Sequence, residues 1–356
     1  MSDANTDFKT GYMIYISKKV LFITLFCILA ALSVGLALSF GKYPIGFLES
    51  YEIFFDHIRG RVPEGEIAVT KDMIIWELRA PRVLMGLIAG AGLAACGVTM
   101  QSVMRNPLAD PYTTGVSSGA SLGAIIYLIL GISLVPTLIG QNAAIANAFL
   151  LSLIPAGLII LISRFMKTTP AMMILIGVSV MFLFSAITSL IMLVSHPDQV
   201  AEAYSWTAGT LGRATWSNIP ISAGIVSACC AIMMVYSGKL NLLSSGDKCA
   251  RSLGLNPDGT RVVLLVIVSF ATASIVAFTG TIGFIGLVAP HMVRIFVGSD
   301  NRYLMPASMA FGAFMLTAAD CLAREAGTAG LPVGVVTAMI GGPLFLYLLV
   351  RKGKRT

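Results

Sequence analysis

VVLLVIVSFATASIVAFTGTIGFIGLVAPHMV, from Val262 to Val293, contains no Asp, Glu, Lys or Arg in 32 residues. A membrane-spanning helix needs about 20 apolar residues, so this stretch is too long for one ordinary span. Thr279-Gly280-Thr281 near its middle can form a tight reversal, because glycine tolerates backbone angles that other residues resist. We therefore predict that the stretch forms two helices.

The whole chain has the same apolar character. Of its 356 residues, 56% are hydrophobic and 12% are charged, whereas soluble domains carry about 25% charged residues. Apolar runs occur at about 20–41, 83–104, 113–135, 143–163, 171–195, 218–237, 262–279, 281–298, 304–321 and 332–350. These runs predict an all-α integral membrane protein with ten transmembrane helices.

The distribution of charge predicts the orientation of these helices. Cytoplasmic loops of membrane proteins collect Lys and Arg. If ten spans begin in the cytoplasm, the inner segments hold 16 of the 24 Lys and Arg residues, and the outer segments hold 11 of the 17 acidic residues. Nine spans would place the basic tail outside. Both termini are therefore expected in the cytoplasm, and the protein in the cell membrane.

The predicted organisation is simple. It comprises a cytoplasmic tail at 1–19, a ten-helix domain at 20–350 and a basic cytoplasmic tail at 351–356. The longer segments outside the membrane are expected at 42–82 and 196–217 on the outer side and at 238–261 on the inner side. Trp206 and Trp216 in the second of these suit a helix at the level of the lipid headgroups.

No catalytic or metal-binding motif is evident. HExxH, GxSxG and CxxC are absent, the nearest approach to a phosphate-binding loop, Leu36–Tyr43, lacks its first Gly and its final Ser or Thr, and the three histidines lie in different segments. The cysteines are interpreted as small buried hydrophobic residues; they are Cys27, Cys96, Cys229, Cys230, Cys249 and Cys321. The net charge of +7 forms no basic stripe with interleaved aromatic residues, so we expect no nucleic-acid partner.

The source of energy for any transport must also be considered. An ion-coupled secondary transporter would be expected to carry carboxylates or histidines near the middle of the membrane, and the apolar runs contain almost none. Asp320 and Arg324 could form a structural ion pair or serve a function at the outer end of the ninth run. A partner that supplies energy is favoured, while a self-contained secondary transporter and a scaffold or receptor without transport remain alternatives.

The inner segment contains a candidate site for such a partner. Ser245 can cap a helix, Asp247 suits its positive end, and Gly254 can terminate it. The pattern predicts a short helix on the cytoplasmic face. A plain solvated loop is equally compatible with the spacing.

Several motifs together resemble one family. They are Leu78-Arg-Ala-Pro-Arg82, Met100-Gln101, Arg105-Asn-Pro-Leu-Ala-Asp-Pro111, Gly115-Val-Ser-Ser-Gly-Ala120, Gly246–Gly254, Gly283–Arg294, Ala319-Asp-Cys-Leu-Ala-Arg324 and Leu331–Pro343. In order and spacing, over about residues 75 to 350, they resemble the FecCD family of permeases, which belong to type II ABC importers for ferric siderophores, haem and cobalamin.

This resemblance implies the partners. Two ten-helix subunits, expected to be identical, would surround a central path in the lipid membrane. Two ABC ATPase subunits would sit below them, and one periplasmic or lipid-anchored binding protein would dock above. The permease itself would bind no cofactor, because ATP and Mg belong to the ATPase.

The resemblance also implies roles for individual residues. Contact with the ATPase is expected from Asp247, Lys248, Ala250, Arg251, Leu253 and Gly254, with Ala250 and Leu253 packing in its groove. Docking of the binding protein is expected from Arg79, Arg82 and Arg324, although the first two could instead anchor a span at the membrane surface. The translocation path or gate is expected to include Met100, Gln101, Asn106, Pro107, Ser117 and Ser118, for which close packing or a structural turn is the alternative.

The substrate is expected to be a ferric siderophore first, with haem and cobalamin next. Residues 49–77 form a longer outer segment than the shortest family members have, with seven acidic residues. This segment is expected either to add contacts to the binding protein or to be a mobile loop.

Overall fold

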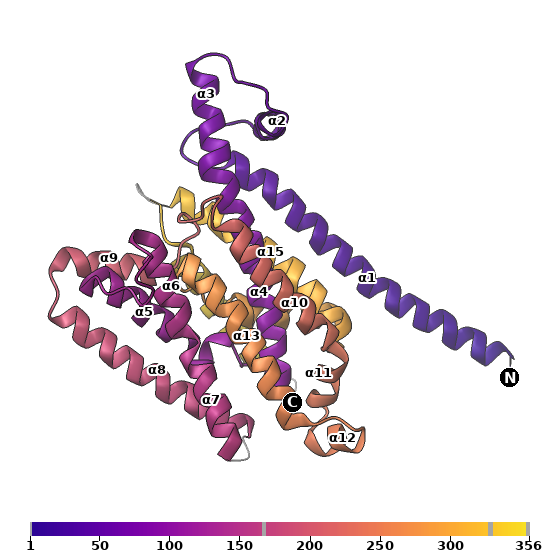
Figure 1. Ribbon diagram of the computed structural model, residues 1–356. Coiled ribbons are helices and arrows are strands. Elements are labelled where there is room, and N and C mark those ends of the chain that lie inside the picture. The colour runs from indigo at the N-terminus through magenta and orange to yellow at the C-terminus, as the bar shows by residue number, and fades with distance from the viewer. Residues whose placement is uncertain (1, 166–168, 327–329, 354–356) are drawn as a thin grey trace.

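The computed structural model describes residues 2–165, 169–326 and 330–353, and within these ranges the chain is helical without strands (Figure 1). The helices are α1 Ser2–Ser39, α2 Phe47–Ile58, α3 Glu66–Met73, η1 Ile74–Arg79, α4 Ala80–Val103, η2 Pro111–Thr114, α5 Val116–Leu130, α6 Gly140–Ser152, α7 Ile154–Phe165, α8 Pro170–Leu193, α9 Pro197–Thr207, α10 Ile219–Val235, α11 Ser237–Ser244, α12 Asp247–Ser252, α13 Pro257–Thr279, α14 Ile285–Val297, α15 Asn301–Glu325 and α16 Val333–Gly353. The predicted tail at 351–356 lies outside the described residues beyond Gly353.

The long uncharged stretch forms two helices, as predicted. Gly280, with φ +73°, ends α13, and its N–H donates to the carbonyl of Val276 over 2.8 Å. This left-handed conformation is one that glycine adopts without a steric penalty. The chain then begins α14 at Ile285.

Helix length limits which elements can cross a membrane alone. Six helical stretches within the described residues are long and apolar enough, and α10 with α11 adds a seventh if this pair, bent by 57°, is one span. The shorter apolar helices α5, α14 and α16 correspond to the remaining predicted runs. The count of ten spans and the orientation of both termini stay predictions.

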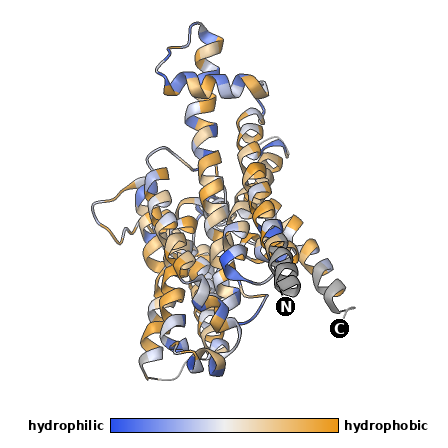
Figure 2. Cartoon of the chain, turned by 90° about the vertical axis from the view of Figure 1, so that its right-hand side faces the viewer, coloured by the Kyte–Doolittle hydropathy of each residue, from blue (hydrophilic) through white to orange (hydrophobic). Residues whose placement is uncertain are grey.

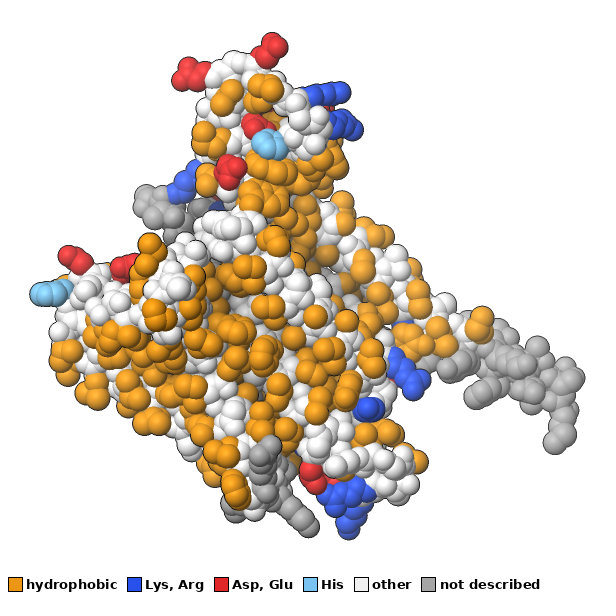
Figure 3. Space-filling model, viewed as in Figure 1, with side chains coloured by type: hydrophobic (Ala, Val, Ile, Leu, Met, Phe, Trp, Pro, Cys, Tyr) orange, Lys and Arg blue, Asp and Glu red, His pale blue; other side chains and the backbone are white. Residues whose placement is uncertain are grey.

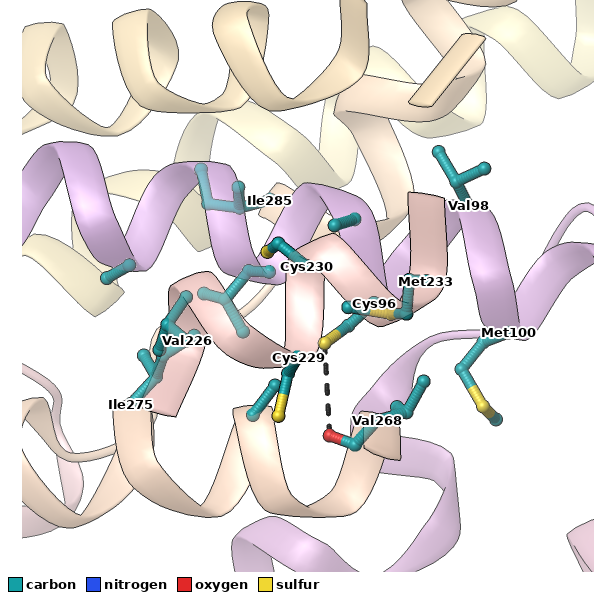
Figure 4. Packing of buried hydrophobic residues seen from close by; sticks show 14 of the residues in the cluster. Cys96, Val98, Met100, Val226, Cys229, Cys230, Met233, Val268, Ile275 and Ile285 are labelled. Atoms are coloured by element: carbon teal, nitrogen blue, oxygen red, sulfur yellow. Dashed lines mark hydrogen bonds between the residues drawn. The ribbon is translucent and has the colours of Figure 1, made fainter. Parts of the chain in front are cut away.

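Helix α4 lies at the centre of the bundle, packed against α10, α13, α14 and α15. Glycines permit its close crossings: a side chain at Gly90 would collide with the carbonyl oxygen of Gly312, and one at Gly97 with that of Gly286. Small residues at helix crossings let backbones approach closely within a membrane. Figure 4 shows part of this core, where the Cys96 thiol donates to the carbonyl of Val268 over 3.8 Å.

Polar and apolar surfaces are separated along the long axis. In the space-filling view, hydrophobic side chains cover much of the middle of the molecule, acidic and basic side chains gather at its top, mainly basic ones at its bottom, and further acidic and His side chains lie at its left edge (Figure 3). The cysteine interpretation holds for Cys96, Cys229 and Cys230, which are buried, but is wrong for Cys27 and Cys249, which are exposed. Cys27 lies on α1, and other helices cover only a small part of the apolar stretch Ile16–Ser39 of this helix.

Three element boundaries differ from the sequence-based expectation. Helix α1 begins at Ser2 rather than near residue 20, so the predicted tail at 1–19 continues the first helix. Helices α3, η1 and α4 form one stretch, Glu66–Val103, that carries the second predicted run far beyond its expected outer end. Trp206 is buried within the chain, whereas Trp216 is partly exposed and stacks on Trp76.

Candidate functional site

Helix α12 is the short inner helix that the sequence predicted. It occupies Asp247–Ser252, between α11 and α13, and Gly254 follows it with φ +80°. Its N-cap is Gly246, with φ +105°. The prediction that Ser245 caps this helix is wrong, because the Ser245 hydroxyl donates to the carbonyl of Asn241 in α11 over 3.2 Å.

The outward face of α12 is polar with one large apolar side chain. Lys248 and Arg251 are exposed, and Leu253 just after the helix is 62% exposed. Ala250 is fully buried within the chain, so it has no surface to offer a second protein. Of the two predicted packing residues, only Leu253 is exposed, and its contact with an ATPase stays a prediction.

A buried arginine fixes α12 to the rest of the bundle. Arg261 in α13 has no exposed surface and forms a two-pronged ion pair with Asp247, in which Nη1 donates to Oδ2 over 3.0 Å. Its Nε donates to the carbonyl of Val103, the last residue of α4, over 3.3 Å. Helix α12 is thus joined through one side chain to both α13 and α4.

Two further arginines lie near the Arg261–Asp247 pair. Arg105, whose φ of +49° is unusual for a residue with a side chain, lies 3.6 Å from Asp247. Arg251 donates to Asp258 over 2.9 Å. The hydrogen bonds from Arg261, helped by these charges, hold the pKa of Asp247 below its ordinary value. Sequence reasoning missed Arg105 and Arg261; a basic residue near the positive N-terminal end of a helix, as Arg261 is, was the available signal.

The outer arginines are tied into the fold. Arg79 is 6% exposed and donates to the carbonyls of Leu38, Ser39 and Tyr43 over 2.6, 2.8 and 2.7 Å. Its guanidinium therefore satisfies backbone oxygens that the end of α1 leaves without helical partners. Arg324 makes the same kind of bond to Ala37 over 2.8 Å.

Asp320 pairs with both Arg82 and Arg324. It is 1% exposed, accepts from Arg82 over distances of 2.7 to 3.0 Å, and accepts from Nε of Arg324 over 2.8 Å. The structural ion pair between Asp320 and Arg324 is therefore present, with Arg82 as a third member. The side chain of Arg82 is 22% exposed, which makes it the most accessible of the three predicted docking arginines. The docking role itself stays a prediction.

A cavity of about 480 Å³ opens at this outer cluster. Its lining includes Lys42, Arg79, Arg82 and Arg324 and no acidic side chain. Such a surface attracts carboxylates or other anions, because arginine offers a planar pair of donors and the site excludes part of the water.

The predicted path residues are divided between core and turn. Met100 is fully buried, and Gln101, 4% exposed, accepts from Arg294 over 2.9 Å. Both lie inside the bundle of this subunit, which favours the close-packing alternative for them. Asn106 and Pro107 are partly exposed in the turn after α4, where the Asn106 side chain accepts from the N–H of Leu108 over 2.9 Å.

The last two predicted path residues lie on α5. Ser117 and Ser118 are half-buried, and the hydroxyl of Ser118 donates to the carbonyl of Gly115 over 2.9 Å. No group of three or more His, Cys, Asp or Glu side chains that could hold a metal ion occurs within the described residues. The expectation of a permease without its own cofactor stays a prediction.

Comparison with known proteins gives a consistent result. Residues 25–351 match the model of the FecCD transport family. The cobalamin import system permease protein BtuC of Halobacterium salinarum is 40% identical over 79% of this chain and 74% of its own length. The hemin transport system permease protein HmuU of Yersinia pestis is 36% identical over 78% of this chain and 84% of its own length.

A solved structure has the same architecture. An inward-facing conformation of a metal-chelate type ABC transporter superposes with a TM-score of 0.80 at 28% identity, covering 92% of this chain and 98% of that chain. The agreement extends over nearly all of both chains, so the whole fold is shared.

Proposed function

Because the chain belongs to the FecCD transport family, we propose that it is the permease subunit of an importer that moves a metal chelate from an external binding protein into the cytoplasm. A separate ABC ATPase, holding ATP and Mg, supplies the energy. Two copies of the permease enclose the path, two ATPase subunits bind inside, and one binding protein docks outside.

The observation that carries this proposal is the anchored helix α12. A short helix with an exposed Leu253 and two exposed cations offers a compact surface to a partner, while the Arg261–Asp247 pair connects that surface to α4 and α13. Movement of a bound ATPase would therefore displace the inner ends of two central helices, rather than only a loop.

The outer cluster supports the delivery step. Arg82 and Lys42 can meet carboxylates of a docking protein or an anionic chelate, while Arg79 and Arg324 hold the end of α1 in place. Opposed charges speed and orient such an encounter. Arg82 is already paired with Asp320, so an incoming carboxylate would share the guanidinium with it.

The substrate is proposed at the level of chemical class. A ferric siderophore remains our first proposal, and haem and cobalamin are supported by the hemin and cobalamin permeases among the relatives. Direct binding of each compound to the cognate binding protein separates them. Tight binding of hemin or cobalamin without binding of any ferric siderophore would overturn the first choice.

Reconstitution tests the proposed function. Proteoliposomes that contain the permease, its ATPase and the binding protein should take up the labelled chelate only with ATP and all three components. Uptake by the permease alone under a proton or sodium gradient would refute the proposal in favour of secondary transport.

A matched pair of variants tests the role of α12. Leu253→Asp should abolish co-purification of the ATPase, because it places a charge in the apolar contact. Ile139→Asp, at a residue that is 80% exposed in the loop before α6, should leave it intact. Equal retention of the ATPase by both variants would count against α12 as the contact.

A further inference from the structure

Helix α2 has two chemically different faces. Successive residues of an α-helix turn by about 100°, so one face of α2 collects the apolar side chains Phe47, Leu48, Tyr51, Phe55 and Ile58. Of these, Leu48 is 75% exposed, Phe55 48% and Ile58 57%. The opposite face carries Glu49 and Asp56, while Glu52 lies at the border between the two faces.

The apolar face is turned toward the membrane-spanning part of α1. The hydroxyl end of Tyr51 lies directly over Gly35, where a Cβ atom would collide with the tyrosine ring. Gly35 lies one turn before the outer end of α1 at Ser39. Phe47 and Phe55 flank Tyr51 with ring centroids 5.4 and 6.4 Å away, so the three rings form one group on α2.

Two tryptophans mark the level at which α2 lies. His57 of α2 stacks on Trp76 with ring centroids 4.1 Å apart, and Trp76 stacks on Trp216 at 4.5 Å. Tryptophan is enriched where a membrane meets water. Figure 1 shows α2 end-on beside α3, and Figure 2 shows it lengthwise, lying across the direction of the long helices just beyond the outer end of α1.

Charged contacts fix α2 in this position. His57 and Asp72 of α3 lie 2.9 Å apart, and Lys71 of α3 forms an ion pair with Glu49. The expectation of a mobile loop at 49–77 is therefore not supported, because the segment contains two helices that are joined by side-chain contacts. The exposed apolar face belongs to a held element.

The geometry points to an occupant for this face: we propose that α2 lies in the outer headgroup layer of the membrane, with its apolar face on the acyl chains. The surface is continuous with the lipid-facing side chains of α1, where Leu32, Leu36 and Phe40 are about half exposed. An amphipathic helix of this kind lies in the plane of the membrane surface. The acidic face, where Glu49 pairs with Lys71 of α3, is then turned away from the acyl chains.

Photocrosslinking in lipid nanodiscs tests the proposal. The full chain carries p-benzoylphenylalanine at Phe55, or at Asp56 as the control on the acidic face, in nanodiscs of phosphatidylcholine and phosphatidylglycerol. Illumination should give a phospholipid adduct at position 55 in several-fold higher yield than at position 56. Equal yields at the two positions would overturn the proposal. A crosslink from position 55 to a second protein chain, without any lipid adduct, would overturn it as well.

A second measurement covers the case in which the photocrosslinker disturbs folding. Phe55→Trp and Asp56→Trp are compared in nanodiscs with and without brominated acyl chains, after the signal of the native protein is subtracted. Bromine should quench the fluorescence added at position 55 and leave that at position 56 nearly unchanged. Similar quenching at both positions would place the helix outside the proposed orientation.

Discussion

Replacing Asp247 by Asn should release helix α12 from the bundle. The substitution keeps the shape of the side chain but removes the charge that accepts two bonds from buried Arg261. Hydrogen bonds to charged groups contribute about 1.5 to 3 kcal/mol each, and the side chain of Asp247 is 31% exposed, which reduces the effect through solvent screening. We expect a net loss of about 2 kcal/mol in the attachment of α12.

Hydrogen exchange measures this loss. A change of about 2 kcal/mol corresponds to a roughly thirtyfold increase in the population of the detached helix, so the α12 amides should exchange about thirtyfold faster than in the native chain. Arg251→Met is the control, because it breaks the exposed pair between Arg251 of α12 and Asp258 of α13, and such pairs contribute about 0 to 1 kcal/mol. It should change the exchange rate by less than about fivefold.

The same variant has a consequence for transport. In the reconstituted importer, Asp247→Asn should lower the amount of chelate moved per ATP hydrolysed, because the ATPase then moves α12 without moving α4 and α13. Exchange of α12 within twofold of the native rate, or an unchanged ratio of transport to hydrolysis, would refute the reasoning.

Three other outcomes are expected. Arg79→Met should lower the thermal stability of the purified chain by about 3 kcal/mol, because it removes the donor to three backbone carbonyls at and just after the end of α1. Arg82→Gln leaves Asp320 its pair with Arg324, so it should lower stability less and should weaken binding of the external protein; the reverse pattern in thermal melts and binding assays would assign docking to Arg79. Gly90→Ala should destabilise the crossing of α4 and α15 by about 1 to 3 kcal/mol, while Gly224→Ala should leave stability unchanged, because a Cβ atom there meets nothing within 4 Å. Equal melting temperatures of the two variants would contradict the role of this crossing. Burial raises the pKa of Asp110 in the inner turn to about 6. The folded chain therefore holds this proton more tightly than the unfolded chain does, and stability should fall as pH rises from about 4 to about 7. Asp110→Asn should flatten that part of the plot of melting temperature against pH, and a plot unchanged by the substitution would exclude Asp110 as its cause.

The sequence predicted those features that depend on local composition. The break at Gly280 and the short helix before Gly254 follow from uncharged length and from glycine placement, and both are present. The family resemblance also assigned a role to Arg79 and Arg324, but it did not indicate their partners within the fold. Those partners are carbonyls at the end of α1, 36 to 41 residues from Arg79 and 287 residues from Arg324, so only the assembled fold brings them together.

The sequence also did not predict which residues in and just after the short helix α12 are buried. Ala250 and Leu253 both qualify as packing residues by type, yet the first is covered by the chain itself and the second is open. The direction of a six-residue helix is set by its anchors, Arg261 and Arg105, and neither lies within the helix. The amphipathic pattern of α2 was present in the sequence, but the segment 49–77 was interpreted only through its seven acidic residues, three of which lie on α2.

The bond between Arg324 and Ala37 also has a meaning for biosynthesis. The first helix enters the membrane long before its partner in α15 has been made, since 287 residues separate the two. At about 5 to 20 residues per second, a ribosome needs roughly 15 to 60 s to cover that distance. During this interval the carbonyl of Ala37 lacks its final donor. The contacts that hold the outer end of the first helix are therefore complete only after α15, one of the last helices, has been made.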